Sequence, residues 1–147
     1  MAINTAFAGR TFPPSEPYEV SRVKIAEFAD AVGNTSAAHR DPAAAKELGY
    51  RDVIAPPTFA VLISQQAEMA YVLDPAAGID FTRTVHANER FVHHRPIVAG
   101  DWITATTTVD SIQDRGSIAL ATTRTELTTV EGEPVATVYS TLAVRGE

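Results

Sequence analysis

The sequence contains no cysteine among its 147 residues. This absence excludes a disulfide framework, a thiolate nucleophile and any metal site built on cysteine. Positive charge is also scarce, since 12 Lys and Arg stand against 18 Asp and Glu and the net charge is −6. The basic residues are scattered singly rather than gathered in a run. Without a positive surface field, neither nucleic acid nor an anionic membrane is an expected partner.

Long apolar runs are missing too. No stretch approaches the roughly 18 apolar residues that a membrane-spanning helix needs, and residues 1–6 lack the basic and apolar regions of a signal peptide. We therefore expect a cytoplasmic protein. What is present is a globular composition, with 45% hydrophobic and 20% charged residues. A chain of this length has room for one domain, so residues 1–147 are predicted to fold as a single unit.

The first half of the chain has the periodicity and punctuation of helices. Ser21 is a typical N-cap for an amphipathic helix, and Asp41–Pro42 starts a second, shorter helix that ends at Gly49. The run from Phe59 to Leu73 is apolar on nearly every side. A helix of this kind belongs inside the molecule or at a subunit interface.

From Thr82 onward, β-branched residues alternate with a period of two, which predicts antiparallel sheet. Turn residues divide this half into four strands, approximately 82–93, 102–112, 117–129 and 134–144. Another strand near Tyr18 to Val20 completes the sheet, and the long helix is the only candidate to cover one of its faces. The predicted fold is α+β, with one central helix wrapped by an antiparallel sheet of about five strands.

Histidines are the only side chains here that titrate near neutral pH without help from their surroundings. There are four of them: His39, His86, His93 and His94. His93 and His94 are neighbours on a predicted strand and therefore point to opposite faces, so regular geometry cannot bring both to one ion. His39 lies in the irregular segment between two short helices, where catalytic residues are often held over a scaffold. We expect no metal site, and His39 is either a catalytic residue or a solvated loop histidine.

Two motifs resemble those of the MaoC-like dehydratases, a branch of the hot-dog fold. Residues 33–42 read GNTSAAHRDP and are followed by VIAPP at 53–57; residues 90–91 read RF and residues 95–101 read RPIVAGD. The family has Gly-Asp, Pro and His in the first motif, which ends in Ile-Ala-His-Gly, and Arg-Phe, Pro-Val and Gly-Asp in the second. The resemblance covers residues 18–144. It implies a single hot-dog domain that dimerises and binds an acyl thioester between subunits, without a metal or redox cofactor.

The family chemistry is reversible loss of water from a (3R)-hydroxyacyl thioester of coenzyme A or acyl-carrier protein. The resemblance implies that His39 is the catalytic histidine, that Asn34 stands where the family has its catalytic Asp, and that Pro57 replaces the Gly whose N–H binds the thioester oxygen. Asn cannot transfer a proton near neutral pH, and Pro has no N–H. Thr58 could offer a neighbouring amide. We predict His39 and Asn34 as catalytic positions and Pro56, Pro57, Thr58 and Trp102 as substrate-binding, although a Trp on a strand is more often a packing residue.

The segment Ile54 to Phe59, IAPPTF, and the residues FPP at 12–14 narrow the resemblance. They are similar to small actinobacterial proteins related to the N-terminal domain of fatty-acid-synthase-type dehydratases, a group with non-catalytic subunits of heterodimeric dehydratases. We therefore predict a dehydratase or enoyl hydratase component of fatty acid metabolism, a substrate-binding subunit that needs a catalytic partner. It forms a homodimer or pairs with a hot-dog chain whose motif is complete. The alternatives are a non-catalytic acyl-thioester-binding protein and, less favoured, a thioesterase that uses Glu68 of the long helix.

Overall fold

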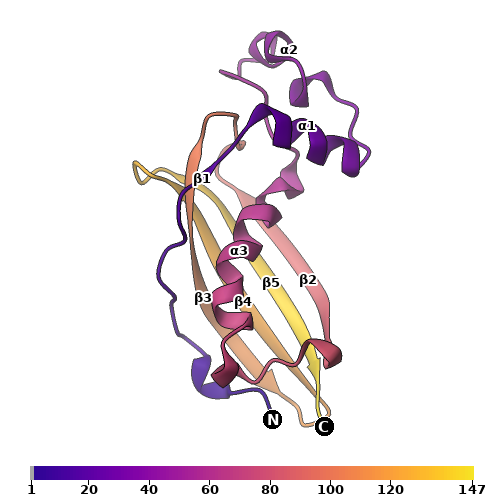
Figure 1. The fold of residues 1–147 in the computed structure, drawn as a ribbon, viewed down its shortest axis with the longest axis vertical. Coiled ribbons are helices and arrows are strands. Elements are labelled where there is room, and N and C mark those ends of the chain that lie inside the picture. Colours follow the sequence, from indigo (N-terminus) through magenta and orange to yellow (C-terminus); the bar gives the residue numbers. More distant parts are fainter. Residues whose placement is uncertain (1) are drawn as a thin grey trace.

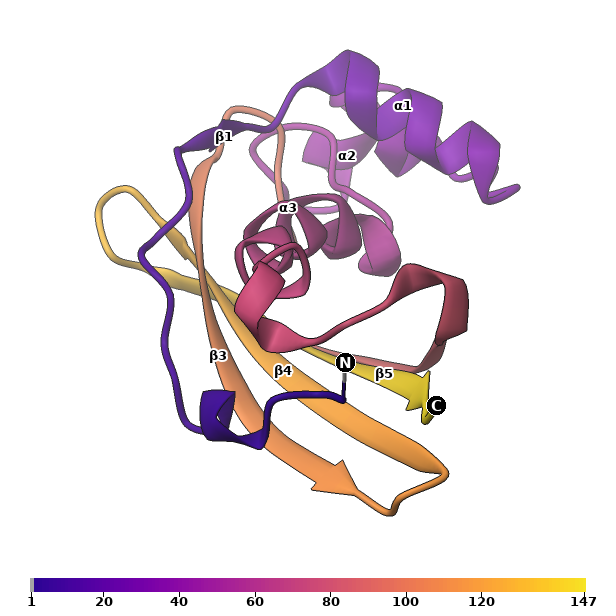
Figure 2. The same cartoon turned by 60° about the horizontal axis from the view of Figure 1, so that its bottom comes forward.

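Five strands form one antiparallel sheet in the order β1-β3-β4-β5-β2 in the computed structural model, which describes residues 2–147. The strands are β1 (Tyr18–Glu19), β2 (Thr84–His93), β3 (Trp102–Asp114), β4 (Ile118–Thr129) and β5 (Pro134–Arg145). The sheet curls around one long helix, as Figures 1 and 2 show from two directions. The single-domain hot-dog architecture expected from the sequence is confirmed.

Tight turns join β3 to β4 and β4 to β5. Gly116 and Gly132 occupy them with φ angles of 79° and 91°, a region that L side chains rarely adopt. Along β3 and β4, buried and more exposed residues alternate over most of the strand, as expected for a sheet with one face on the core. The predicted hairpins are therefore confirmed. One boundary differs, because residues Phe81–Arg83 form a short 3₁₀ turn (η5) before β2 begins.

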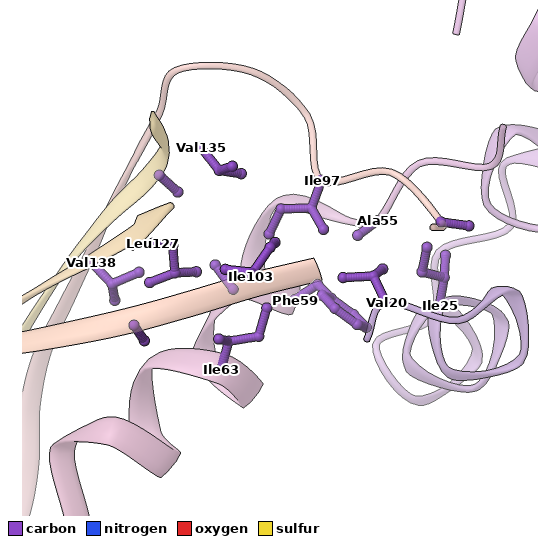
Figure 3. Close-up of a cluster of buried hydrophobic side chains, with 14 of the residues drawn as sticks. Val20, Ile25, Ala55, Phe59, Ile63, Ile97, Ile103, Leu127, Val135 and Val138 are labelled. Atoms are coloured by element: carbon purple, nitrogen blue, oxygen red, sulfur yellow. The ribbon is translucent and has the colours of Figure 1, made fainter. Parts of the chain in front are cut away.

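The central helix α3 (Ala60–Val72) is preceded by a 3₁₀ turn, η3 (Pro57–Phe59). Phe59 and Ile63 are buried against Ile103, Leu127 and Val138 of the sheet (Figure 3). Of the thirteen residues of α3, only Gln65, Gln66 and Ala70 are exposed. The sheet thus covers the apolar surface of the helix more completely than its composition suggested. None of the helices formed by residues 2–147 is long and apolar enough to cross a membrane.

Three short elements form a lobe beyond one end of the sheet, next to the start of α3 (Figure 1). They are α1 (Arg22–Ala31), η2 (Ala37–His39) and α2 (Pro42–Glu47). Ser21 caps α1 by accepting a hydrogen bond from the Lys24 amide at 3.1 Å, and Asp41 caps α2 in the same way. The rings of Phe28 and Phe59 pack edge to face, with centroids 5.5 Å apart, and so attach the lobe to the core.

The N-terminal segment runs along the outer edge of β3. After the turn η1 (Thr5–Phe7), the amides of Gly9, Phe12 and Ser15 donate to carbonyls of β3 at 2.7 to 2.9 Å. This segment supplies hydrogen-bond partners for the part of the β3 edge that the two-residue strand β1 does not reach. A further turn, η4 (Pro75–Ala77), follows α3. β2 forms the opposite edge of the sheet and, in the part of the chain that the structure describes, pairs with β5 alone.

Candidate active site

His39 is buried at the end of η2, where the lobe meets the start of α3. Its Nδ1 lies 2.6 Å from the carbonyl oxygen of Ile54, and the Ile54 amide donates to the carbonyl of Ala38 at 3.0 Å. A carbonyl oxygen can only accept, so Nδ1 carries a proton, and in the neutral ring Nε2 holds the lone pair. His39 is therefore held in the tautomer that a general base requires. It is not a solvated loop histidine.

A pocket of about 320 Å³ opens beside His39. It is lined by His39, Ile54, Ala55, Pro57, His93, Arg95, Pro96 and Ile97. Two loops build its walls and are joined by backbone hydrogen bonds, from Ala55 to the carbonyl of Ile97 at 2.8 Å and from Ala99 to that of Val53 at 3.0 Å. The walls are apolar apart from two imidazoles and one guanidinium, which suits a small number of directed polar contacts in a mainly hydrophobic site.

Asp101 holds one of these loops in place. Its buried carboxylate accepts hydrogen bonds from Arg95 at 2.8 Å, from Arg51 at 2.5 Å and from the Val98 amide at 2.9 Å. Burial alone raises the pKa of Asp101, but the hydrogen bonds, that from Arg95 first, outweigh it and hold this pKa below its usual range. Arg95 is also paired with Glu133 at 2.8 Å. The second motif therefore positions the pocket wall, and the charge of Arg95 is already neutralised.

Asn34 takes part in its own loop. Its Oδ1 accepts the amide hydrogen of Ser36 at 3.1 Å, and its carbonyl accepts from Arg40 at 2.6 Å. Among residues 2–147, no hydrogen bond joins Asn34 to His39. The structure thus accounts for Asn34 as a turn residue, and a catalytic role for it stays a prediction.

The predicted substrate-binding residues lie in different places. Pro57 lines the His39 pocket, whereas Pro56 is buried beside it and Thr58 is exposed and outside the lining. Trp102 is 46% exposed and borders a separate pocket of about 280 Å³, together with Arg51 and Arg95. Of these four residues, only Pro57 shares a pocket with His39.

His93 also lines the pocket, and it is the second titratable side chain there, although the sequence did not single it out as a site residue. Its Nε2 lies 2.7 Å from the carbonyl oxygen of Pro57, and its ring stacks on Phe91 with centroids 6.3 Å apart. His94 instead contacts the Thr137 hydroxyl at 3.3 Å and does not line the pocket. The alternation rule separated the two rings, but it could not tell which of them faces His39.

A second polar cluster lies further along α3. Glu68 is buried and accepts a hydrogen bond from Thr123 at 2.9 Å, while His86 lies 2.6 Å from Glu89. Burial is the main cause that raises the pKa of Glu89. Ser140 and Glu89 both approach the same nitrogen of His86, Nε2, so these three residues do not form a nucleophile relay, which requires both ring nitrogens. The pocket here shares no residue with that of His39.

Metal binding has no cluster to support it in the described part of the chain. Residues 2–147 contain no group of three or more His, Asp or Glu side chains placed to hold an ion. The four histidines are divided among the His39 pocket, the Glu68 cluster and a position after β2 where His94 contacts Thr137.

Comparison with known proteins agrees with this architecture. A UPF0336 protein of Saccharopolyspora erythraea is 53% identical over 146 residues, which cover 99% of this chain and 94% of the relative. The solved HadBC (3R-hydroxyacyl-ACP dehydratase) complex from Mycobacterium tuberculosis contains a chain that superposes with a TM-score of 0.85 and 29% identity, over 93% of this chain and 96% of that one. A MaoC-like dehydratase also gives a TM-score of 0.85, with 32% identity over 96% of this chain and 43% of that one. The family model of the FAS1-like dehydratase domain region matches residues 6–138, and the chain therefore belongs to this family of MaoC-like hot-dog proteins.

Proposed function

We propose that the chain is a component of a (3R)-hydroxyacyl thioester dehydratase, which also catalyses the reverse hydration of an enoyl thioester. The observation that carries the proposal is the His39 ring. It is buried, its Nδ1–H is bound to the Ile54 carbonyl, and its Nε2 is left as a proton acceptor in an apolar pocket. Membership of the dehydratase family supports the same chemistry. The substrate class is an acyl thioester of coenzyme A or acyl-carrier protein.

The local chemistry at the start of α3 supports a subunit that works with a partner. Removing the proton next to a thioester develops negative charge on the thioester oxygen, which backbone N–H groups normally stabilise. Pro56 and Pro57 have no N–H, and Thr58 lies outside the pocket lining. Loss of one such donor typically costs about 10²–10³ in rate. The isolated chain is therefore a weak catalyst, and a hot-dog partner with a complete motif supplies the main activity.

The free edge of β2 supports dimerisation, either with a second copy or with such a partner. Val85 and Val92 on this strand are 65% and 37% exposed, and within residues 2–147 no further strand lies beside its backbone edge. The HadBC and ChsH1-ChsH2 proteins from Mycobacterium tuberculosis were both solved as complexes of two different chains. They supply precedent for a mixed pair of chains with this fold.

A second candidate is a non-catalytic acyl-thioester-binding protein. The hydrogen bond between Asn34 and the Ser36 amide of its own loop favours this candidate, because the position that carries the family's acid is then occupied by a turn residue.

A thioesterase is less favoured. Its carboxylate would be Glu68, which is hydrogen-bonded to Thr123 and lines a different pocket from His39.

An assay of enoyl-thioester hydration tests the proposal directly. Crotonyl-CoA and a long-chain enoyl-CoA are offered to the chain alone and to its complex with a motif-complete hot-dog chain, while calorimetry measures acyl-CoA binding. We expect binding in both cases, weak turnover by the chain alone and rapid turnover by the complex. Binding without turnover in the complex would favour the non-catalytic alternative. Rapid turnover by the chain alone would contradict the need for a partner, and neither binding nor turnover would contradict the whole proposal.

A further inference from the structure

Two imidazoles share the pocket although they come from distant parts of the chain. His39 belongs to η2 in the lobe, and His93 is the last residue of β2. Each ring is bound to a backbone carbonyl of the same short loop, that of Ile54 for His39 and that of Pro57 for His93. The loop before α3 therefore orients both rings at once.

The two carbonyls also select which nitrogen of each ring is available. Because the Pro57 oxygen accepts, Nε2 of His93 carries a proton, just as Nδ1 of His39 does. The remaining nitrogens, Nε2 of His39 and Nδ1 of His93, have no hydrogen-bond partner in the described chain. Both rings thus keep one nitrogen for a bound molecule.

No other residue of the pocket lining can exchange a proton near neutral pH. The only other polar side chain is that of Arg95, which stays protonated and is bound to Asp101 and Glu133. The backbone neighbour of His93 on β5 is Ala136, and the ring beside it is that of Phe91. The charged or titratable groups that border His93 in the pocket are therefore His39 and the neutralised Arg95. His93 itself is exposed at the strand end, so it can exchange protons with solvent.

We propose that His93 is the second acid–base residue of this pocket, in the role that Asn34 cannot perform. The proposal rests on the proposed dehydratase function and identifies the partner of His39. In dehydration, Nε2 of neutral His39 takes the α-proton, and the electron pair of the broken C–H bond forms the C=C bond. The β C–O bond breaks, and its hydroxyl takes a proton from Nδ1 of His93 in the imidazolium form, leaving as water. The proton on His39 and the vacancy on His93 are then exchanged with solvent, and hydration follows the same steps in reverse.

Carbonyl binding suits His93 to this role. The imidazolium keeps its Nε2–H bond to Pro57 and has a second N–H at Nδ1, so gaining a proton does not break the contact that holds this pocket-lining ring. His39 acts as the base through Nε2, the ring nitrogen that the Ile54 carbonyl leaves without a hydrogen bond. Because Pro56 and Pro57 have no N–H to stabilise the thioester oxygen, we expect dehydration by His39 and His93 to be slow but measurable.

The test uses the complex described above, with the catalytic His and Asp of the partner chain replaced. Any turnover that remains then belongs to the pocket of this chain. His93→Gln is the informative variant, because a Gln amide can still donate to the Pro57 carbonyl but cannot transfer a proton. His94→Gln is the matched control on the neighbouring residue, which lies outside the pocket.

We expect His93→Gln to lower kcat by about 10²-fold or more with little change in KM, since general acid–base groups contribute about 10²–10⁴ to the rate. The fall of kcat at alkaline pH should also flatten in this variant, whereas His94→Gln should behave as the unsubstituted chain.

A kcat for His93→Gln within about twofold of that chain would overturn the assignment, because Gln removes the proton transfer that the assignment requires. So would the absence of turnover with the disabled partner. If the intact complex is active in that case, the proposed dehydratase function stands and only the role of His93 falls. An inactive intact complex would remove both.

Discussion

Asp101 is the residue on which the arginines beside the pocket depend. Replacing it by Asn would leave Arg95 and Arg51 without the carboxylate that they share. We expect Asp101→Asn to lower the free energy of unfolding by on the order of 3 kcal/mol, as removal of one partner of a buried ion pair usually does, less a discount because Arg51 is largely exposed. Urea denaturation measures this loss. Asp110→Asn is the matched control, since its pair with Arg124 is partly exposed and is expected to contribute less than about 1 kcal/mol. Equal losses in both variants would contradict the role given to Asp101.

The contribution of Asp101 to stability also depends on pH with a definite sign. Its pKa in the folded protein lies below the ordinary value of 3.8, so the unfolded chain binds the proton more readily. The stabilisation is therefore present above about pH 4 and is lost as the pH falls through the lower folded pKa. The difference in unfolding free energy between the original chain and Asp101→Asn should shrink between pH 6 and pH 3. A difference that grows in acid would show that the carboxylate is not the stabilising form.

Among the elements, the start of α3 connects the lobe, the sheet and the pocket. Phe59 is fully buried there among the core side chains (Figure 3). Its ring packs edge to face on Phe28 of α1 and Tyr18 of β1. We expect Phe59→Ala to destabilise the protein by about 3–5 kcal/mol, because it leaves a cavity at this junction. Phe81→Ala is the control, since Phe81 is 56% exposed.

Hydrogen exchange gives a second measure of that change. The amides of α1 should lose protection in Phe59→Ala before those of β3 to β5 do, because the lobe is attached through this ring. Uniform loss of protection across lobe and sheet would contradict a separate docking of the lobe. A destabilisation below about 1 kcal/mol would show that the junction does not depend on Phe59.

At the scale of the whole molecule, the two edges of the sheet differ. The N-terminal segment covers the edge of β3, whereas β2 carries exposed valines and an open backbone edge. We expect a dimer in solution at micromolar concentration, with twice the chain mass of 15.8 kDa by light scattering. Lys at both Val85 and Val92 should shift it toward the monomer. Val130→Lys, on a half-exposed hairpin residue away from β2, should not. A monomeric unsubstituted chain would contradict this expectation.

The surface available for association differs from the one that the sequence indicated. The apolar composition of residues 59–73 suggested that the central helix itself has surface left over for a partner. In the folded chain, the most exposed positions of α3 are Gln65, Gln66 and Ala70. The other residues of α3 are buried or half-buried, and the N-terminal rings of Phe7 and Phe12 pack against Tyr71. The exposed edge of β2 is therefore the surface at which we expect association.

Local sequence determined the order of the elements, because capping, turn formation and strand alternation depend on residues only a few positions apart. Ser21 and Asp41 start helices, Gly116 and Gly132 permit hairpins, and the motif around His39 indicates the family. Tertiary structure alone decided the tautomer of His39 and the entry of His93 into its pocket. The carbonyls that bind these rings lie 15 and 36 residues away in sequence, and no local periodicity encodes such contacts. The face that a strand residue presents also depends on irregularities such as the register shift between His86 and Asn88, because an extra residue in one strand reverses the alternation beyond it.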